Sequence, residues 1–100
     1  MQTLIRNRFS SPVSQHEVAQ DWEERGYSCD LFVDPPDQKW NNFVHSCDEL
    51  VVVVNGRVRM IIGEDSWDLS PGDQIFVPRG AIHSVHNIFY GQSRWLYGYN

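Results

Sequence analysis

Positive charge is scarce in this chain. Lysine and arginine supply 8 of its 100 residues, aspartate and glutamate supply 13, and the formal net charge is −5. The basic residues are scattered, so no basic stripe is present that would neutralise the phosphates of a nucleic acid. This scarcity argues against nucleic acid as a partner.

Long apolar runs and cysteines are scarce as well. No apolar run approaches the ~20 residues that span a bilayer, and residues 1–10 contain two arginines but no apolar core of a signal peptide. Nothing marks Cys29 and Cys47, the only cysteines, as a disulfide framework. We therefore expect no membrane partner and a cytoplasmic protein with reduced thiols.

Apolar residues are nevertheless frequent enough to build a core. The chain is 41% hydrophobic and 13% aromatic, which is too rich for a disordered protein. It contains no internal repeat, low-complexity tract or linker, and a chain of this length makes one domain at most. We predict a single domain over residues 1–100.

One helix is predicted near the N-terminus, over about residues 15–25. Ser14 is suited to cap its first turn, and Glu17 three residues later completes the pattern of a capping box. Val18 and Trp22 are four residues apart and form one apolar face, and Gly26 is a natural end for the helix.

From residue 27 onward the sequence indicates short β-strands separated by glycine and proline turns. We expect strands over residues 27–33, 40–45, 49–54, 57–62, 67–69, 74–77, 83–87 with 88–90 as a continuation, and 94–99. The predicted turns are Pro35-Pro36, Asn55-Gly56, residues 63–66 and Pro71-Gly72. Asn-Gly is the pair favoured in type I′ hairpin turns. Many short strands of this kind are typical of an all-β sandwich or barrel.

The most informative stretch, residues 72–87, has the form G-x5-P-x-G-x2-H-x3-N. Pro78 cannot donate to a sheet ladder, so the strand before it ends there or reaches an edge. Gly80 permits the reversal into a hairpin partner strand. His83 and Asn87 then point to one face of that strand, because side chains alternate.

A second group of polar residues lies at 45–49. His45, Cys47 and Glu49 share one face if the strand is regular. Two imidazoles and a carboxylate, brought together inside a barrel, form a ligand set for a first-row transition metal. We therefore take His45, Glu49 and His83 as candidate metal ligands.

Both stretches resemble the cupin family. Residues 72–87 are similar to the second cupin motif at every marked position, and residues 45–56 to the second half of the first motif, G-x5-H-x-H-x3–4-E-x6-G. The resemblance covers about residues 40–99. It implies a double-stranded β-helix, or jelly roll, that holds one divalent metal ion such as Fe, Mn, Ni or Zn.

The first motif is incomplete. Its opening glycine would fall at Asp37 and its first histidine at Phe43. The remaining His45, Glu49 and His83 are similar to a 2-His-1-carboxylate triad, which leaves coordination positions open.

Four further residues are expected at the pocket or around the ligands. Phe43 should pack the pocket wall, and Cys47 should be a pocket thiol or a small apolar residue. Asn87 is expected to form structural hydrogen bonds close to the site. Arg79, at the rim, is either solvated or a bidentate contact for a substrate carboxylate.

The aromatic residues Trp40, Trp67, Trp95, Tyr97 and Tyr99 allow two interpretations. They fill the core or a dimer interface, which is the commoner role and our expectation. Alternatively, they line the mouth of an apolar pocket that stacks a small organic molecule.

Three functions follow as alternatives. The first is a metalloenzyme that acts on a small anionic or aromatic compound, and the resemblance implies dioxygenase, isomerase, decarboxylase or lyase chemistry without selecting one. The second is a non-catalytic small-molecule-binding or sensing module, which the missing histidine favours. The third is a structural partner in a larger assembly.

We also expect a homodimer. A barrel of 100 residues has a limited core, and its N-terminal β segment and aromatic tail could extend a neighbour's sheet or cover its edge.

Overall fold

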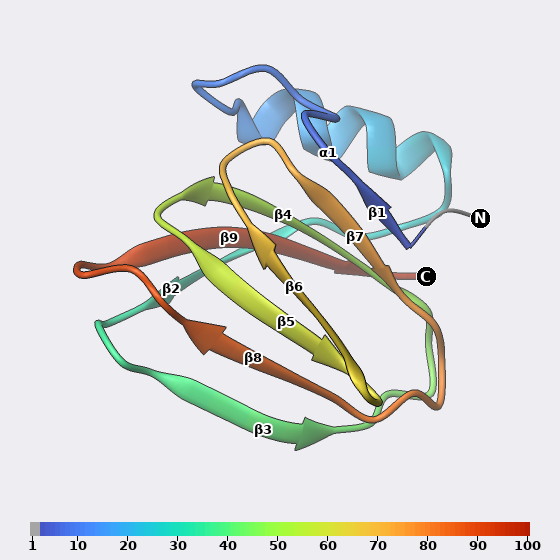
Figure 1. Ribbon diagram of the computed structural model, residues 1–100. Coiled ribbons are helices and arrows are strands. Elements are labelled where there is room, and N and C mark those ends of the chain that lie inside the picture. The colour runs from blue at the N-terminus through green and yellow to red at the C-terminus, as the bar shows by residue number, and fades with distance from the viewer. Residues whose placement is uncertain (1–2) are drawn as a thin grey trace.

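The computed structural model of the protein describes residues 3–100. In this part of the chain, two antiparallel sheets face each other, and the helix covers the outer face of the larger one (Figure 1). The elements are β1 (Leu4–Ile5), α1 (Gln15–Glu24), β2 (Asp30–Asp34), β3 (Lys39–Phe43), β4 (Glu49–Asn55), β5 (Val58–Ile62), β6 (Asp65–Leu69), β7 (Gln74–Val77), β8 (His83–Asn87) and β9 (Ser93–Tyr99). The larger sheet has the order β1-β7-β4-β9-β2 and the smaller one β3-β8-β5-β6. This arrangement confirms the predicted all-β jelly-roll class with one N-terminal helix.

The helix begins and ends where its sequence signals indicate. Oγ of Ser14 accepts the backbone N–H of Glu17 at 3.3 Å. At the other end, Gly26 has a φ of 83°, its N–H donates to Glu23, and the N–H of Tyr27 donates to Trp22 at 2.9 Å. These two bonds form a Schellman motif, which closes the helix and draws residue 27 out of the strand that was predicted to begin there.

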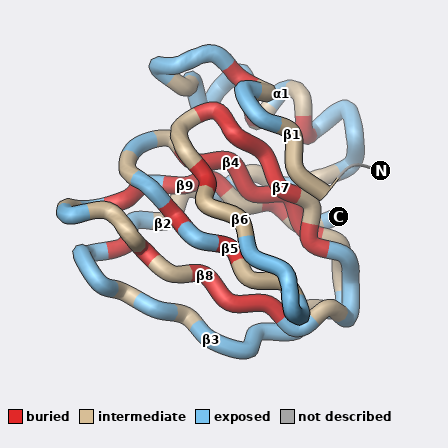
Figure 2. The backbone as a smooth tube through the Cα atoms, viewed as in Figure 1, coloured by how far each residue is buried: buried red, intermediate tan, exposed pale blue. Residues whose placement is uncertain are grey.

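The run of four valines in β4 is explained by burial on both faces. Val51 and Val53 lie between the two sheets, in a cluster that includes Met60 and Ile75. The alternate residues Leu50 and Val52 face the helix and pack in a second cluster with Val18 and Trp22. Figure 2 shows β4 as a buried strand beneath α1. A strand buried on both faces needs a continuous apolar run instead of alternation.

Two predicted hairpins are wrong. Strands β4 and β5 belong to different sheets, so the Asn55-Gly56 turn joins the two layers instead of pairing neighbours. Gly56 has a φ of 92°, but Asn55 is not among the residues with positive φ, as a type I′ turn would require. Strands β7 and β8, on either side of Pro78 and Gly80, are likewise in different sheets.

Several strand boundaries also differ from the prediction. Strand β6 begins at Asp65, so the preceding turn is shorter than residues 63–66. Strand β8 ends at Asn87, because the side-chain Oδ1 of Asn87 accepts the N–H of Phe89 and turns the chain there. Strand β3 ends at Phe43, which leaves His45 in a loop. The short β1 was not predicted. No helix within residues 3–100 is long and apolar enough to cross a membrane.

Candidate metal centre and its pocket

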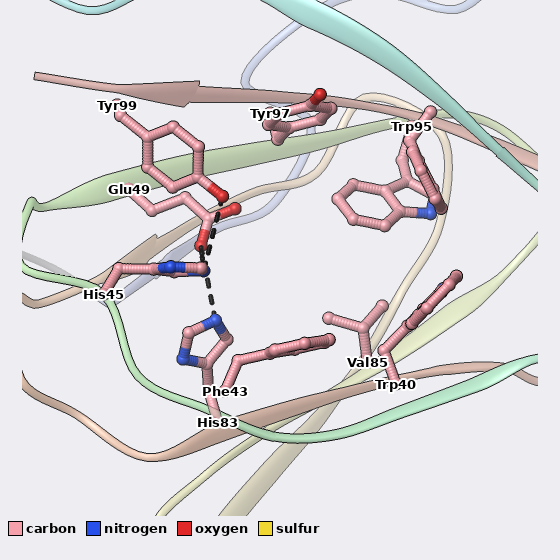
Figure 3. Close-up of a pocket in the computed structure, with 10 residues that line it drawn as sticks. Trp40, Phe43, His45, Glu49, His83, Val85, Trp95, Tyr97 and Tyr99 are labelled. Atoms are coloured by element: carbon pink, nitrogen blue, oxygen red, sulfur yellow. Dashed lines mark hydrogen bonds and ion pairs between the residues drawn. The ribbon is translucent and has the colours of Figure 1, made fainter.

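Three side chains that could ligate a metal meet in the space between the sheets. His45 lies in the loop between β3 and β4, Glu49 begins β4, and His83 begins β8. Oε1 of Glu49 is 3.4 Å from Nε2 of His83 and 3.7 Å from Nε2 of His45 (Figure 3). One possible ligand atom from each residue lies within 4.8 Å of the other two. The structure thus brings together the three residues that the sequence indicated.

His83 is oriented by its own backbone neighbourhood. Its side chain is almost fully buried, and Nδ1 lies 3.1 Å from the carbonyl oxygen of Ala81. When the ring is neutral, Nδ1 donates this bond and Nε2 presents a lone pair toward Glu49, as metal-binding histidines do. Burial lowers the pKa of His83, but the Glu49 carboxylate and the Ala81 carbonyl outweigh burial and hold the pKa above its usual value.

Glu49 provides the test of whether an ion fits. The residue is 4% exposed, and among the described residues no hydrogen-bond donor reaches its Oε1. Leaving a buried acceptor unpaired costs ~1–3 kcal/mol, and more for a charged group. Ligands held about 2.1 Å from one ion are separated by about 3.0–3.5 Å, close to the distances from Glu49 to both histidines. A divalent cation would satisfy this oxygen, so the donor set fits a metal.

His45 is held in place although it lies outside any strand. Its carbonyl accepts the N–H of Gly80 at 2.9 Å, which ties the β3–β4 loop to the β7–β8 turn. Its Nε2 lies 3.3 Å from the hydroxyl of Tyr99. Burial, with Glu49, Tyr97 and Cys47 nearby, raises the pKa of Tyr99 to about 12. The phenol therefore keeps its proton and remains a hydrogen-bond donor at neutral pH.

A cavity of about 310 Å³ is lined in part by the three candidate ligands. Six aromatic side chains, which we call the aromatic wall, line it: Phe32, Trp40, Phe43, Trp95, Tyr97 and Tyr99. From Phe43 to Tyr99 each ring in this wall is 5.3–6.1 Å from the next, centroid to centroid. The ring of His45 closes the circuit, at 6.1 Å from Phe43 and 4.9 Å from Tyr99. Figure 3 shows these side chains arranged around an open space.

Asp34 fixes two tryptophans of the aromatic wall. It is fully buried at the end of β2 and does not line the cavity. Its Oδ1 accepts the indole N–H of Trp40 and its Oδ2 accepts that of Trp95, each at 2.9 Å. One carboxylate therefore joins a ring from the smaller sheet to a ring from the larger sheet.

The other predicted site residues divide into two groups. Phe43 lines the cavity, as expected. Cys47 is half-buried but does not line the cavity. Asn87 is buried and structural: its amide donates to the carbonyls of Pro35 and Gly91, and its Oδ1 accepts from Ser93.

Arg79 forms its contacts outside the lining of the cavity. Its side chain is 65% exposed and its Nε lies 3.5 Å from Oδ1 of Asp48, which also accepts the backbone N–H of Arg79. It is not among the residues that line the cavity, so its predicted contact with a substrate anion has no support in this geometry.

The sequence left open whether the aromatic residues fill the core or line an apolar pocket, and their positions in the structure distinguish the two roles. Trp40, Trp95, Tyr97 and Tyr99 line the cavity, and the first three also pack in or against the core between the sheets, so both interpretations hold for those three. Trp67 packs against the core only. Sequence reasoning missed Phe32 and Asp34; their spacing of two on one strand was the available signal that they share a face.

Two facing antiparallel sheets that enclose a His-His-Glu group define a small barrel of the cupin type. Residues 31–99 match the sequence profile of the cupin domain, and the chain belongs to this family. The departure at the first motif has a structural counterpart, since Asp37 has a φ of 64° at the position where the family has glycine.

Solved structures of other proteins share this fold. TT1209 from Thermus thermophilus has a TM-score of 0.66 and 28% identity, with 73% of this chain and 71% of that chain covered. A cupin 2 domain-containing protein from Halorhodospira halophila has a TM-score of 0.69 and 19% identity, covering 74% and 51%. The DMSP lyase DddQ from Ruegeria pomeroyi DSS-3 has a TM-score of 0.67 and 19% identity, covering 74% and 38%.

One curated relative also matches. The uncharacterized protein SCO3923 of Streptomyces coelicolor is 34% identical over 44 residues. These residues make up 44% of this chain and 42% of that protein, so the match spans less than half of the relative's length.

Proposed function

We propose that this cupin binds one divalent transition metal through His45, Glu49 and His83 and acts on a small organic molecule in the adjoining cavity. The observation that carries the proposal is the buried Oε1 of Glu49, which has no donor among the described residues and faces two imidazole nitrogens. Mixed imidazole and carboxylate sets suit Fe, Mn, Ni and Zn. The cytoplasmic location and the homodimer stay predictions.

A metal held by three protein ligands supplies Lewis-acid or O₂ chemistry at its open positions. The chain's own residues have the other roles. The carbonyl of Ala81 orients His83, and the loop bond from Gly80 positions His45. Tyr99 offers a hydroxyl beside the ligands, and the aromatic wall excludes water and packs against the substrate. Dioxygenase, isomerase, decarboxylase and lyase reactions all stay open.

Replacement of one ligand histidine tests the metal site. His83→Ala should lose the metal, because it removes the most buried nitrogen ligand. His86→Ala is the matched control, since His86 lies on the same strand with its Nε2 bonded to Asn41 at an exposed position. Metal content is measured by mass spectrometry on protein purified without chelator. Equal metal content in His83→Ala and wild type would refute the site.

A binding module without turnover is the second candidate. Phe43 occupies the position of the family's first histidine, and its ring forms part of the aromatic wall of the cavity. Protein that carries no metal after purification without chelator, yet binds an organic ligand tightly in this cavity, would favour this candidate over the metalloenzyme.

A further inference from the structure

The cavity combines aromatic rings with the carboxylate of Glu49, and its basic residues among the described lining residues are the two candidate metal ligands His45 and His83. None of the described lysines or arginines lines it, and Glu49 is the only carboxylate among its described lining residues. Aromatic faces carry the negative part of the ring quadrupole. Away from the proposed metal, an anionic group would therefore meet repulsion, and Arg79, the expected anion contact, is bonded to Asp48 outside the cavity.

Asp34 places a second negative charge behind the aromatic wall. Both of its oxygens accept indole N–H groups and neither donates to a described residue, which is the bonding pattern of a carboxylate. No ion pair formed by the described residues includes it. A carboxylate that accepts an indole N–H polarises the indole and makes its ring face richer in electrons. The faces of Trp40 and Trp95 thus become better partners for positive charge.

We propose that the aromatic wall selects a small organic cation of the quaternary ammonium class. Cation–π attraction is strongest for tryptophan and grows when the cation is desolvated. A quaternary ammonium group has no N–H to satisfy, which suits a cavity whose wall consists mostly of aromatic rings. The inference rests on the proposed function only in taking this cavity as the ligand site, and it requires no bound metal.

The test compares two probes of the same shape. Choline and 3,3-dimethyl-1-butanol share a hydroxyl arm and differ in whether a charged nitrogen or a neutral carbon carries the three methyl groups. Calorimetry on the wild-type protein should show choline binding at least about tenfold more tightly. Equal or tighter binding of the neutral alcohol, tighter binding of benzoate than of choline, or no choline binding at its highest usable concentration would overturn the proposal.

Substitutions test which residues cause the preference for choline over the neutral alcohol. Asp34→Asn should reduce the ratio of choline to alcohol affinity at least about threefold, whereas Asp68→Asn, on an exposed pair with Arg59, should leave it unchanged. Tyr97→Leu avoids any folding defect caused by altering the buried Asp34. It keeps an apolar side chain at a half-buried position, so choline affinity should fall while alcohol affinity does not. Tyr90→Leu, at a position 91% exposed, is its control, and an unchanged ratio in both Asp34→Asn and Tyr97→Leu would contradict the assignment.

The metal-free protein separates this inference from the metal proposal. Choline preference should persist after dialysis against chelator and in His83→Ala, because the rings and Asp34 stay in place. Choline preference without any metal binding would remove the metal proposal alone. Metal binding without choline preference would remove this inference alone.

Discussion

At the scale of single residues, the buried Oε1 of Glu49 has no hydrogen-bond donor among the described residues, and a bound cation would satisfy it. The neighbouring His45 and His83 are 3.4–3.7 Å away from this oxygen. Binding sites commonly retain such residues at a cost to the stability of the unliganded protein. The cost in this protein can be measured by neutralising the carboxylate.

Glu49→Gln should separate stability from metal binding. In the metal-free protein, the amide can donate to Nε2 of His83, and the free energy of unfolding should be equal to wild type or higher by about 1 kcal/mol. Metal affinity should fall at least about 100-fold, because a charged ligand is lost. Urea unfolding and metal titration measure the two effects. Glu23→Gln, on the exposed side of α1, should change neither. A loss of several kcal/mol in Glu49→Gln would instead mark Glu49 as structural.

At the scale of elements, the short β1 is held by side-chain bonds as well as by its ladder. Asp73 accepts the N–H of Asn7 at 2.9 Å, the N–H of Ser70 at 2.9 Å and the guanidinium of Arg6 at 2.8 Å. Burial alone raises the pKa of Asp73, but these donors outweigh burial and leave the pKa below its usual value. The ionised carboxylate thus links the N-terminal segment to the turn before β7.

This linkage predicts acid sensitivity. Because the pKa of Asp73 is depressed in the folded protein, its stabilisation is present above the unfolded pKa of about 3.9 and is lost as the pH falls through the folded value. Asp73→Asn should lower the free energy of unfolding by ~1–3 kcal/mol at pH 7, and the difference from wild type should shrink below about pH 4. Urea unfolding of wild type and Asp73→Asn at pH 7 and below about pH 4 measures this difference. Asp65→Asn, an exposed carboxylate, should show no such pattern, and a constant difference for Asp73→Asn would refute the linkage.

The connection from β4 to β5 passes from one sheet to the other and requires glycine at position 56, where the backbone lies close to Ser93. A Cβ on Gly56 would lie 2.9 Å from Cα of Ser93, and its φ is 92°. Gly63, with a φ of 61°, has nothing within 4 Å of such an atom. Gly56→Ala should therefore lower the free energy of unfolding by ~1–3 kcal/mol more than Gly63→Ala does. Both variants carry the backbone strain of a positive φ, but only the new Cβ at position 56 would clash with the backbone of Ser93. Thermal unfolding of the two variants gives the comparison, and equal losses would contradict it.

Local sequence signals predicted the helix, strands and turns better than they predicted which strands share a sheet. The helix, the buried β4 and the Pro71-Gly72 turn follow from capping, apolar runs and turn chemistry, which act within a few residues. Which sheet a strand joins depends on packing across the whole chain, so the connections at Asn55-Gly56 and at Pro78 and Gly80 were taken for hairpins. The three ligand residues were found because the spacing in two motifs marks them. Phe32 and Asp34 lie outside both motifs, and β2 reaches the cavity only through its pairing with β9.

At the scale of the whole molecule, each sheet of the described residues ends in two edge strands, β1 and β2 in the larger sheet and β3 and β6 in the smaller one. Strands β2 and β3 both lie on the same side of the molecule (Figure 1). The aromatic tail is not available to extend a neighbour's sheet, because β9 lies between β4 and β2. Exposed apolar side chains at this side include Val33 on β2, at 39% exposure, and Phe43 at the end of β3, at 37%.

We predict that the protein is a homodimer that buries this β2–β3 edge. Unpaired strand edges with apolar side chains favour association, and a charge placed on the edge prevents it. Sedimentation velocity should give a mass near twice 11.7 kDa for the wild type. Val33→Glu should give a mass near that of the single chain, and its position opposite Arg94 keeps the strand pairing favourable. Ser66→Glu adds the same charge to β6, the opposite edge of the smaller sheet, and should remain dimeric. A wild-type mass that stays at 11.7 kDa over all concentrations would refute the dimer, and a dimeric Val33→Glu would place the interface elsewhere.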